Sequence, residues 1–141
     1  MSLFLLHPSL MFSTPIDSDA FLRRIRQFGL QLHCPTLILP ETTSGIIRPT
    51  GDAVAAQLTI MSVETFPGIV FVPLTEQRAQ TVVRIVLTRR LRGADAVYVA
   101  TAQEFETTLV TWDKEMLTRG LLAFPIVPTM TPTDWLASHP I

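Results

Sequence analysis

Three carboxylates stand beside apolar segments of this sequence: Asp95 in GADAVYVATA, Asp113 after TTLVTW, and Glu41 after PTLILP. Carboxylate oxygens are the ligands that hard divalent cations prefer, and water bound to such a cation can attack a phosphodiester. Each residue also has a structural interpretation. Asp95 would be a helix-start carboxylate, stabilised by about 0.3 to 1 kcal/mol through the helix dipole. Glu41 would be a solvated helix residue, and Asp113 a turn residue that closes a strand.

The apolar pattern predicts strands that alternate with helices. Short apolar or β-branched runs predict strands at SLFLL, GIVFVPL, TTLVTW and within FPIVPTM, the last followed by a tail. Capped amphipathic patterns predict helices over residues 16–28, 35–49, 51–64 and 75–92, and one from about Ala94. This alternation predicts an α/β fold, a single domain over residues 1–141 with a mainly parallel central sheet flanked by helices.

Two of these helices have a defined apolar face. The helix over residues 16–28 would bury Phe21, Leu22, Ile25 and Phe28. The helix over residues 75–92, capped by Thr75, would bury Ala79, Val82, Val83, Val86 and Leu87. In a parallel α/β sheet, polar groups that do chemistry gather outside the carboxyl ends of the strands. Asp113 occupies such an end.

Composition limits the classes of function. The chain has 141 residues, of which 48% are hydrophobic, and eleven basic against twelve acidic residues give a formal charge of -1. One ordinary domain of this length can bury a core. A general nucleic-acid binder would carry a basic field, so any nucleic-acid contact here must be local. Cys34, the one cysteine, excludes an internal disulfide framework and is expected to be a buried thiol in a reducing compartment.

The apolar N-terminal stretch MSLFLLHPSLMF is not expected to enter a membrane. It has no basic n-region and no small-residue cleavage site, and it is shorter than the roughly 20 residues that a spanning helix needs. We expect a strand that leads into a helix, and a cytoplasmic protein. The sequence has no GxGxxG and no GxxxxGK[ST] nucleotide motif, and no zinc spacing among its cysteine and histidines. A small-ligand α/β domain remains an alternative.

The order of the motifs resembles a known family. LRGADAVYVATA, followed after a short gap by TLVTWDKEML, closely resembles the C-terminal half of a PIN domain, the fold of VapC-type toxin ribonucleases of toxin-antitoxin pairs. LHCPTLILPETTSGIIR resembles the first-half helix that carries the glutamate of that family. The resemblance extends over almost the whole chain, and its GADAVYVATA…LVTWDKE part is the specific one.

This resemblance implies a metal-dependent endoribonuclease that cuts single-stranded RNA. It implies that Glu41, Asp95 and Asp113 bind one or two Mg²⁺ or Mn²⁺ ions, and that Thr111 supports them. It also implies a homodimer and a small antitoxin that covers the site. For the RNA, the basic segment before Asp95 and the helix after Glu41 offer local positive charge, from which we single out Arg48, Arg89 and Arg92. The alternative for these arginines is a solvated helix face, and Trp112 and Tyr98, which could stack on a base, are expected in the core.

One position departs from the family pattern. The family begins with a strand that ends in an aspartate, followed two residues later by Ser or Thr. Here the corresponding text is FLLHPSLMF, with His7 at the aspartate position and Ser9 at the hydroxyl position. A neutral imidazole can bind Mn²⁺ but is a poor ligand for Mg²⁺. Two functions therefore stay open: a working endoribonuclease with altered metal preference, or a catalytically degenerate PIN domain that serves as a binding or partner module.

The substitution His7→Asp tests this alignment. It should increase Mg²⁺-dependent cleavage of RNA because it restores an anionic oxygen at the end of the first strand. A gain of about 1.4 kcal/mol in transition-state stabilisation would make cleavage tenfold faster. Thermal unfolding with and without metal controls for repulsion between the added acid and its neighbours. A folded variant that binds Mg²⁺ no better and cuts no faster would show that His7 does not occupy the metal position.

Overall fold

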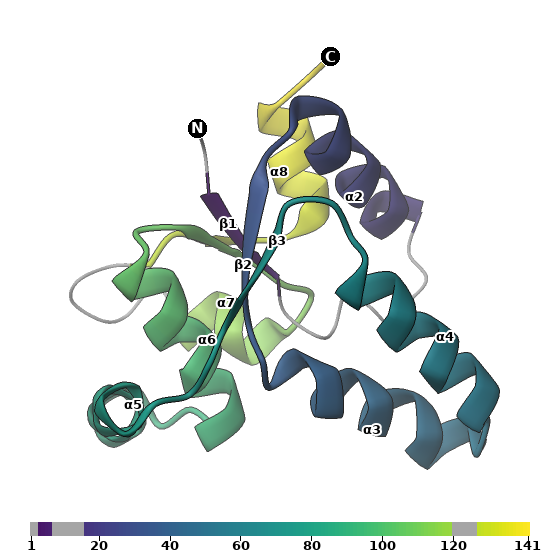
Figure 1. Cartoon of the computed structure of the whole chain (residues 1–141). Helices are drawn as coiled ribbons and strands as arrows, with labels where there is room; N and C mark the ends of the chain where they lie inside the picture. Colours follow the sequence, from purple (N-terminus) through teal and green to yellow (C-terminus); the bar gives the residue numbers. More distant parts are fainter. Residues whose placement is uncertain (1–2, 7–15, 120–126) are drawn as a thin grey trace.

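The computed structural model of the chain describes residues 3–6, 16–119 and 127–141. Helices and strands alternate along it (Figure 1). In chain order the elements are β1 (Leu3–Leu6), α2 (Ile16–Phe28), β2 (Gln31–Pro35), α3 (Ile38–Thr50), α4 (Ala53–Glu64), β3 (Ile69–Val72), α5 (Glu76–Arg89), α6 (Gly93–Glu104), β4 (Thr108–Val110), α7 (Lys114–Arg119), β5 (Thr129–Met130) and α8 (Pro132–Ser138).

These strands form one parallel sheet in the order β3-β2-β1-β4-β5. β1 is central: Leu5 is in register with His33 of β2 and with Leu109 of β4. The predicted α/β fold with a mainly parallel sheet is confirmed. Because every strand runs in the same direction, all carboxyl ends lie at one edge of the sheet, and the segments that follow them meet there.

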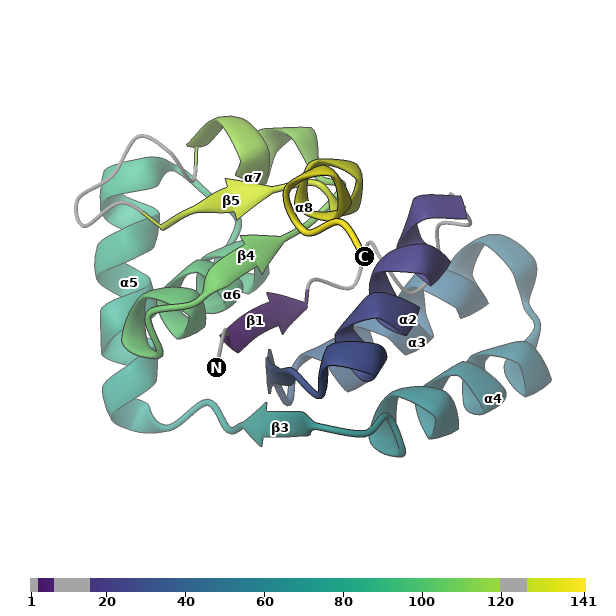
Figure 2. The ribbon, with the colours of Figure 1, turned by 90° about the horizontal axis from the view of Figure 1, so that it is seen from above.

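Helices cover both sides of the sheet. Figures 1 and 2 show α5 and α6 on one side and α2 and α4 on the other. α6 packs against β1, β2 and β4, and all seven residues from Ala96 to Ala102 are buried. This explains the small and apolar composition of GADAVYVATA, because a helix enclosed on several sides has no solvated face.

The chain beyond β5 is a helix rather than a tail. Thr131 caps α8, accepting a hydrogen bond from the Asp134 N–H at 3.1 Å, and Pro132 occupies the first turn. α8 packs against α2, where Trp135 meets Phe21 edge to face with ring centroids 5.1 Å apart. Both rings are fully buried. The expectation of a tail was wrong because α8 is short, and its one large apolar anchor finds its partner more than a hundred residues away in sequence.

A further strand, β2, was also missing from the predicted elements. Its sequence QLHCP contains a histidine and a proline and has no β-branched residue, so it lacks a local strand signal. β2 nevertheless lies next to the central strand and is paired on both sides. Four of its five residues are buried, and Cys34 is one of them, as expected.

The buried face of α5 differs from the predicted one. Val82, Ile85 and Arg89 are buried, whereas Val83 and Leu87 are 56% and 76% exposed. α5 packs mainly against α6, so only a narrow stripe of its surface is covered. Phe28, placed on the buried face of α2, is likewise 47% exposed, although Phe21 and Ile25 are buried as expected.

The local predictions at helix starts are confirmed. Asp52 accepts a hydrogen bond from the Ala55 N–H at 2.9 Å, and Thr75 accepts one from the Arg78 N–H at 3.2 Å. Within residues 3–6, 16–119 and 127–141, no helix has the length and apolar character needed to cross a membrane.

Gly68, which precedes β3, provides a test of the fold. Its φ is +84°, and a Cβ there would lie 2.8 Å from the Leu30 carbonyl oxygen. Gly51 also has a positive φ, +67°, but a Cβ there would meet nothing within 4 Å. We expect Gly51→Ala to lower the free energy of unfolding by about 1 kcal/mol through left-handed strain, and Gly68→Ala to lower it by about 2 to 3 kcal/mol because backbone must also shift. Chemical denaturation measures both, and equal losses would contradict this packing.

Candidate functional site

The topology brings the predicted site segments to the carboxyl edge of the sheet. β2 leads into α3, which carries Glu41, and β4 leads directly to Asp113. α6 runs back to β4 through a short turn, so the first turn of α6, with Asp95, lies at the edge where β4 ends. β1 ends at this edge too. His7 and Ser9, the next predicted residues, lie outside the described part of the chain.

Glu41 and Asp95 each lie in the first turn of a helix. Pro35 closes β2, α3 begins at Ile38, and Pro40 is tolerated because the first turn needs no donor there. No side chain caps α3 or α6 by a hydrogen bond, so the dipole of each helix favours the carboxylate in its first turn. Both side chains are half-buried. Half-burial leaves part of each side chain in contact with solvent.

Asp113 directly precedes α7 and is held by hydrogen bonds to its neighbours. Its Oδ1 accepts a hydrogen bond from the Met116 N–H at 3.0 Å, and its own N–H donates to Thr111 Oγ1 at 3.0 Å. Thr111 is fully buried, so this hydroxyl is a rigid support for the turn. Asp113 therefore has a structural role in this turn, because its Oδ1 caps the helix that follows.

Trp112 ties this turn to α2. Its indole Nε1 donates a hydrogen bond to Ser18 Oγ at 2.7 Å, and Ser18 is buried. The Trp112 ring packs against the edge of the core, as expected. The sequence pattern offers Ser18 only as a possible helix cap, and no local signal predicts that its hydroxyl accepts a hydrogen bond from Trp112.

Tyr98 is a buried hydroxyl on which two of the carboxylates act electrostatically. Its side chain is fully buried one turn after Asp95. Burial, and then the negative charges of Glu41, Cys34 and Asp95, raise the pKa of the Tyr98 hydroxyl far above its ordinary value. Glu41 and Asp95 are therefore close enough to one buried hydroxyl to act on it together, although α3 and α6 are far apart in sequence.

Convergence on a metal ion stays a prediction. Among the residues for which the structure describes side chains, no three His, Cys, Asp or Glu groups lie close enough together to hold an ion. The donor chemistry fits: carboxylates are the oxygen ligands of Mg²⁺ and Mn²⁺, and Mg²⁺ is commonly held through one or two of them with several waters. Glu41 and Asp95 both act electrostatically on Tyr98, and Asp113 follows β4 at the carboxyl edge of the sheet.

The predicted RNA-contact arginines lie in different environments. Arg48 is exposed in the last turn of α3, two turns from Glu41, and Arg92 is exposed at the start of α6, three residues before Asp95. Arg89 is buried, with 7% of its surface exposed. Burial lowers the pKa of its guanidinium, since a low-dielectric setting disfavours the charged form.

Comparison with known families agrees with this arrangement. Residues 9–120 match the PIN domain family, and the chain belongs to that family. Comparison with curated protein sequences gave no significant match.

Solved structures, among them a toxin and a toxin-antitoxin complex, share the fold. PAE2754 from Pyrobaculum aerophilum superimposes with a TM-score of 0.70 at 18% identity, over 97% of this chain and 88% of that one. A toxin-antitoxin complex from Klebsiella pneumoniae gives 0.64 at 18% identity, over 94% and 98%. VapC20 from Mycobacterium tuberculosis, described as a sarcin-ricin loop cleaving toxin, gives 0.64 at 12% identity, over 83% and 95%.

Tyr98 provides a pH test, because it is the only tyrosine in the chain. Its raised pKa means that the folded protein holds the neutral phenol at pH values where the unfolded chain, with a pKa of about 10, ionises. The stability that Tyr98 contributes is therefore complete below about pH 10 and is lost as the pH rises further. In metal-free buffer, tyrosinate absorbance should increase only together with the loss of helical circular dichroism.

The neighbouring charges can be removed one at a time. Because burial is the largest cause of the raised pKa, Asp95→Asn and Glu41→Gln should still form tyrosinate only on unfolding, as should Glu64→Gln, which changes an exposed carboxylate at the end of α4. Ionisation near pH 10 in a protein that keeps its helical signal would contradict the burial of Tyr98.

Proposed function

We propose that this protein is a metal-dependent endoribonuclease of the VapC type that cleaves single-stranded RNA, the toxin of a toxin-antitoxin pair. The observation that carries the proposal is the shared influence of Glu41 and Asp95 on buried Tyr98, at the carboxyl edge of a PIN-domain sheet. Carboxylates that gather at one edge of a sheet are the oxygen ligands that a hard divalent cation prefers. Such a pair suits a Mg²⁺ or Mn²⁺ site.

Each predicted site residue has a defined task in this mechanism. Glu41, Asp95 and Asp113 hold the cation, and Thr111 orients Asp113 through the turn that follows β4. Asp113 has Oδ2 available for this task, because Oδ1 caps α7. A divalent ion held by these carboxylates would lower the pKa of water and offset the charge that develops on the phosphodiester. By the family resemblance, Ser9 and His7 would belong to the same site.

The arginines orient the RNA. Arg92 precedes Asp95 by one helical turn, and Arg48 lies on the helix that carries Glu41, so both can bind phosphates on either side of the bond that is cut. Arg89, at the end of α5, adds positive charge behind Arg92. Tyr98 remains neutral across the physiological range, so its hydroxyl can donate a hydrogen bond to a neighbouring carboxylate without adding charge.

A catalytically degenerate PIN domain is the second candidate, and His7 in LLHPS is the observation that favours it. Loss of the first aspartate removes one anionic ligand and weakens Mg²⁺ binding. In that case the fold and its partner surface would remain, and the carboxylate pair would be a remnant.

A small antitoxin and a second copy of the chain are the proposed protein partners. The toxin-antitoxin complex that shares this fold supports an antitoxin. An exposed apolar stripe on α4 also supports a protein partner: Val54, Leu58 and Met61 recur at one face of the helix and are 68%, 58% and 53% exposed. Apolar side chains aligned on one helix face commonly mark an interaction surface.

The substitution Asp95→Asn tests the catalytic proposal. The amide keeps the shape of the side chain but removes the anionic oxygen that a hard cation needs. We expect wild-type protein with Mn²⁺ to cut a single-stranded RNA, and Asp95→Asn to reduce the rate at least a hundredfold, about 2.7 kcal/mol, with little change in thermal unfolding.

Glu64→Gln is the matched control, because it makes the same carboxylate-to-amide change on an exposed residue at the end of α4. It should cut as fast as wild type. Equal activity of wild type and Asp95→Asn would show that the cleavage comes from a contaminant or another site, whereas a folded wild type inactive with both metals would favour the degenerate domain.

A further inference from the structure

α5 presents one long face to solvent at the periphery of the molecule. Its main neighbour is α6, and Figures 1 and 2 show the helix on the outside of the fold. Five exposed residues, at alternating spacings of four and three, form what we call the outer stripe of α5: Glu76, Gln80, Val83, Leu87 and Arg90. This spacing places side chains in one line along a helix and is typical of the seam between two packed helices.

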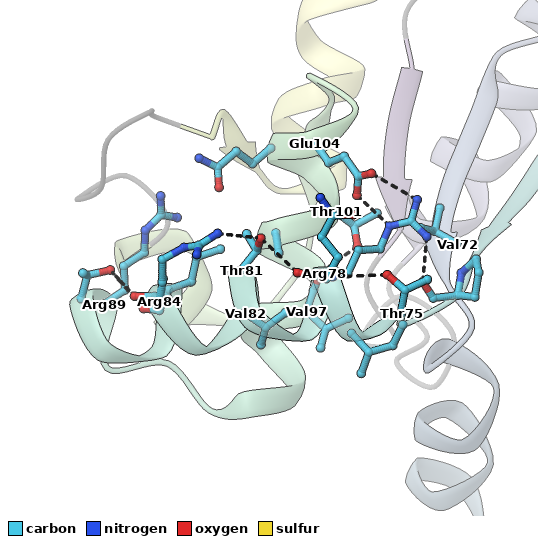
Figure 3. A pocket seen from close by; sticks show the side chains of 17 residues that line it. Val72, Thr75, Arg78, Thr81, Val82, Arg84, Arg89, Val97, Thr101 and Glu104 are labelled. Carbon is cyan, nitrogen blue, oxygen red and sulfur yellow. Dashed lines mark hydrogen bonds and ion pairs between the residues drawn. The ribbon is translucent and has the colours of Figure 1, made fainter.

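The opposite face of α5, which turns toward α6, is engaged within the chain. Val82 is buried there. Arg78 forms an ion pair with Glu104 of α6, with nitrogen to oxygen distances of 2.9 and 3.1 Å (Figure 3). On the outer stripe, by contrast, Val83 and Leu87 are 56% and 76% exposed. Apolar side chains aligned on an outer helix face commonly mark a surface that another molecule covers.

The outer stripe carries opposite charges at its two ends. Glu76 lies in the first turn of α5, and Arg90 directly follows its last residue. Both are exposed, and among the described residues no ion pair involves either side chain. Each lies seven residues from Val83, which is about 10 Å along the helix axis. In an antiparallel pair of α5 helices with a two-fold axis at Val83, Glu76 of each copy therefore lies opposite Arg90 of the other.

The centre of the outer stripe is self-complementary about the same axis. Val83 would meet Val83 of the second copy on the axis itself, as a two-fold interface requires. Leu87 would meet Gln80 and the small side chain of Ala79, which is half-buried beside the stripe. Packed helices lie about 8 to 10 Å apart, a separation that the long side chains of a glutamate and an arginine can bridge.

We propose that two copies of this chain associate through the outer stripe of α5, as an antiparallel helix pair centred on Val83. This inference rests on the proposed homodimer and assigns its surface. It does not depend on the ribonuclease activity, because the outer stripe contains none of the residues placed in the candidate site.

The exposed stripe on α4 fits a second copy less well than the outer stripe of α5 does. Asp52 caps the start of α4, Glu64 ends it, and the helix contains no basic residue. Antiparallel packing of α4 on itself would therefore bring acidic ends together, and like charges that face each other across an interface weaken association.

The oligomeric state of the full-length protein is the direct test. A pair of 14-residue helices buries less than the roughly 1,200 Å² of standard complexes, so we expect a weak dimer with a Kd on the order of 10 μM. Sedimentation velocity in metal-free buffer, from about 1 to 200 μM protein, brackets such an interface. Val83→Glu places two carboxylates against each other on the axis and should weaken dimerisation about a hundredfold.

Leu58→Glu is the matched control. It makes the same change from an apolar to an acidic side chain at a residue of α4 that is 58% exposed, close to the exposure of Val83. It should dimerise as wild type does. Because both residues are exposed, both variants should keep the helical circular dichroism of the wild type.

Charge reversal tests the orientation of the two helices. Glu76→Arg and Arg90→Glu should each weaken dimerisation about tenfold, because the altered pair occurs twice in each dimer. The double variant, with both reversals, restores opposite charges at each end and should return the Kd to within about threefold of wild type. A purely structural effect predicts the reverse order, since each reversal opposes the helix dipole and the double variant would be the worst.

The outcomes separate this proposal from the catalytic one. A wild type that stays monomeric would overturn the α5 dimer, as would a dimer that tolerates Val83→Glu and both reversals, or a double variant weaker than either single one. Asp95→Asn should dimerise as wild type does. A wild type that dimerises through the outer stripe but cuts no RNA with Mn²⁺ would contradict the ribonuclease and support the α5 dimer. A monomer that cuts RNA would do the opposite.

Discussion

The burial of α6 against the centre of the sheet is the constraint on which the rest of this structure depends. A helix whose residues from Ala96 to Ala102 are all buried can neither rotate nor slide without exposing apolar surface. Its two ends are therefore fixed relative to β1, β2 and β4. The first turn places Asp95 at the carboxyl edge of the sheet, and the last turn leads into β4 and so determines where Asp113 stands.

The same burial sets the electrostatics of the candidate site. Tyr98 is enclosed with its hydroxyl near Glu41 and Asp95, which makes ionisation of the phenol costly and keeps the group neutral. The carboxylates, by contrast, are only half-buried in the first turns of helices and keep access to water. A rigid neutral donor beside accessible carboxylates suits a site that accepts and releases a hydrated cation.

α6 also contributes to two different parts of the surface. Asp95 in its first turn belongs to the candidate carboxylate site, and Val97 lines a groove along α5. The turn between α5 and α6, with Arg89, Arg90 and Arg92, joins these two parts of the surface.

The predicted apolar face of α5 was too wide, because Val83 and Leu87 are exposed. A helix that packs mainly on one neighbour buries only a narrow stripe of its surface.

Local chemistry in the sequence determined the alternation of strands and helices, the parallel sheet, the caps Asp52 and Thr75, and the family to which the chain belongs. These features depend on neighbouring residues, so a single sequence contains them. Tertiary structure decided that QLHCP is a buried strand, that α8 packs on Phe21, and that Glu41 and Asp95 both raise the pKa of Tyr98. In each case the deciding contact joins segments far apart in the chain, and burial, not propensity, supplies the stabilising free energy.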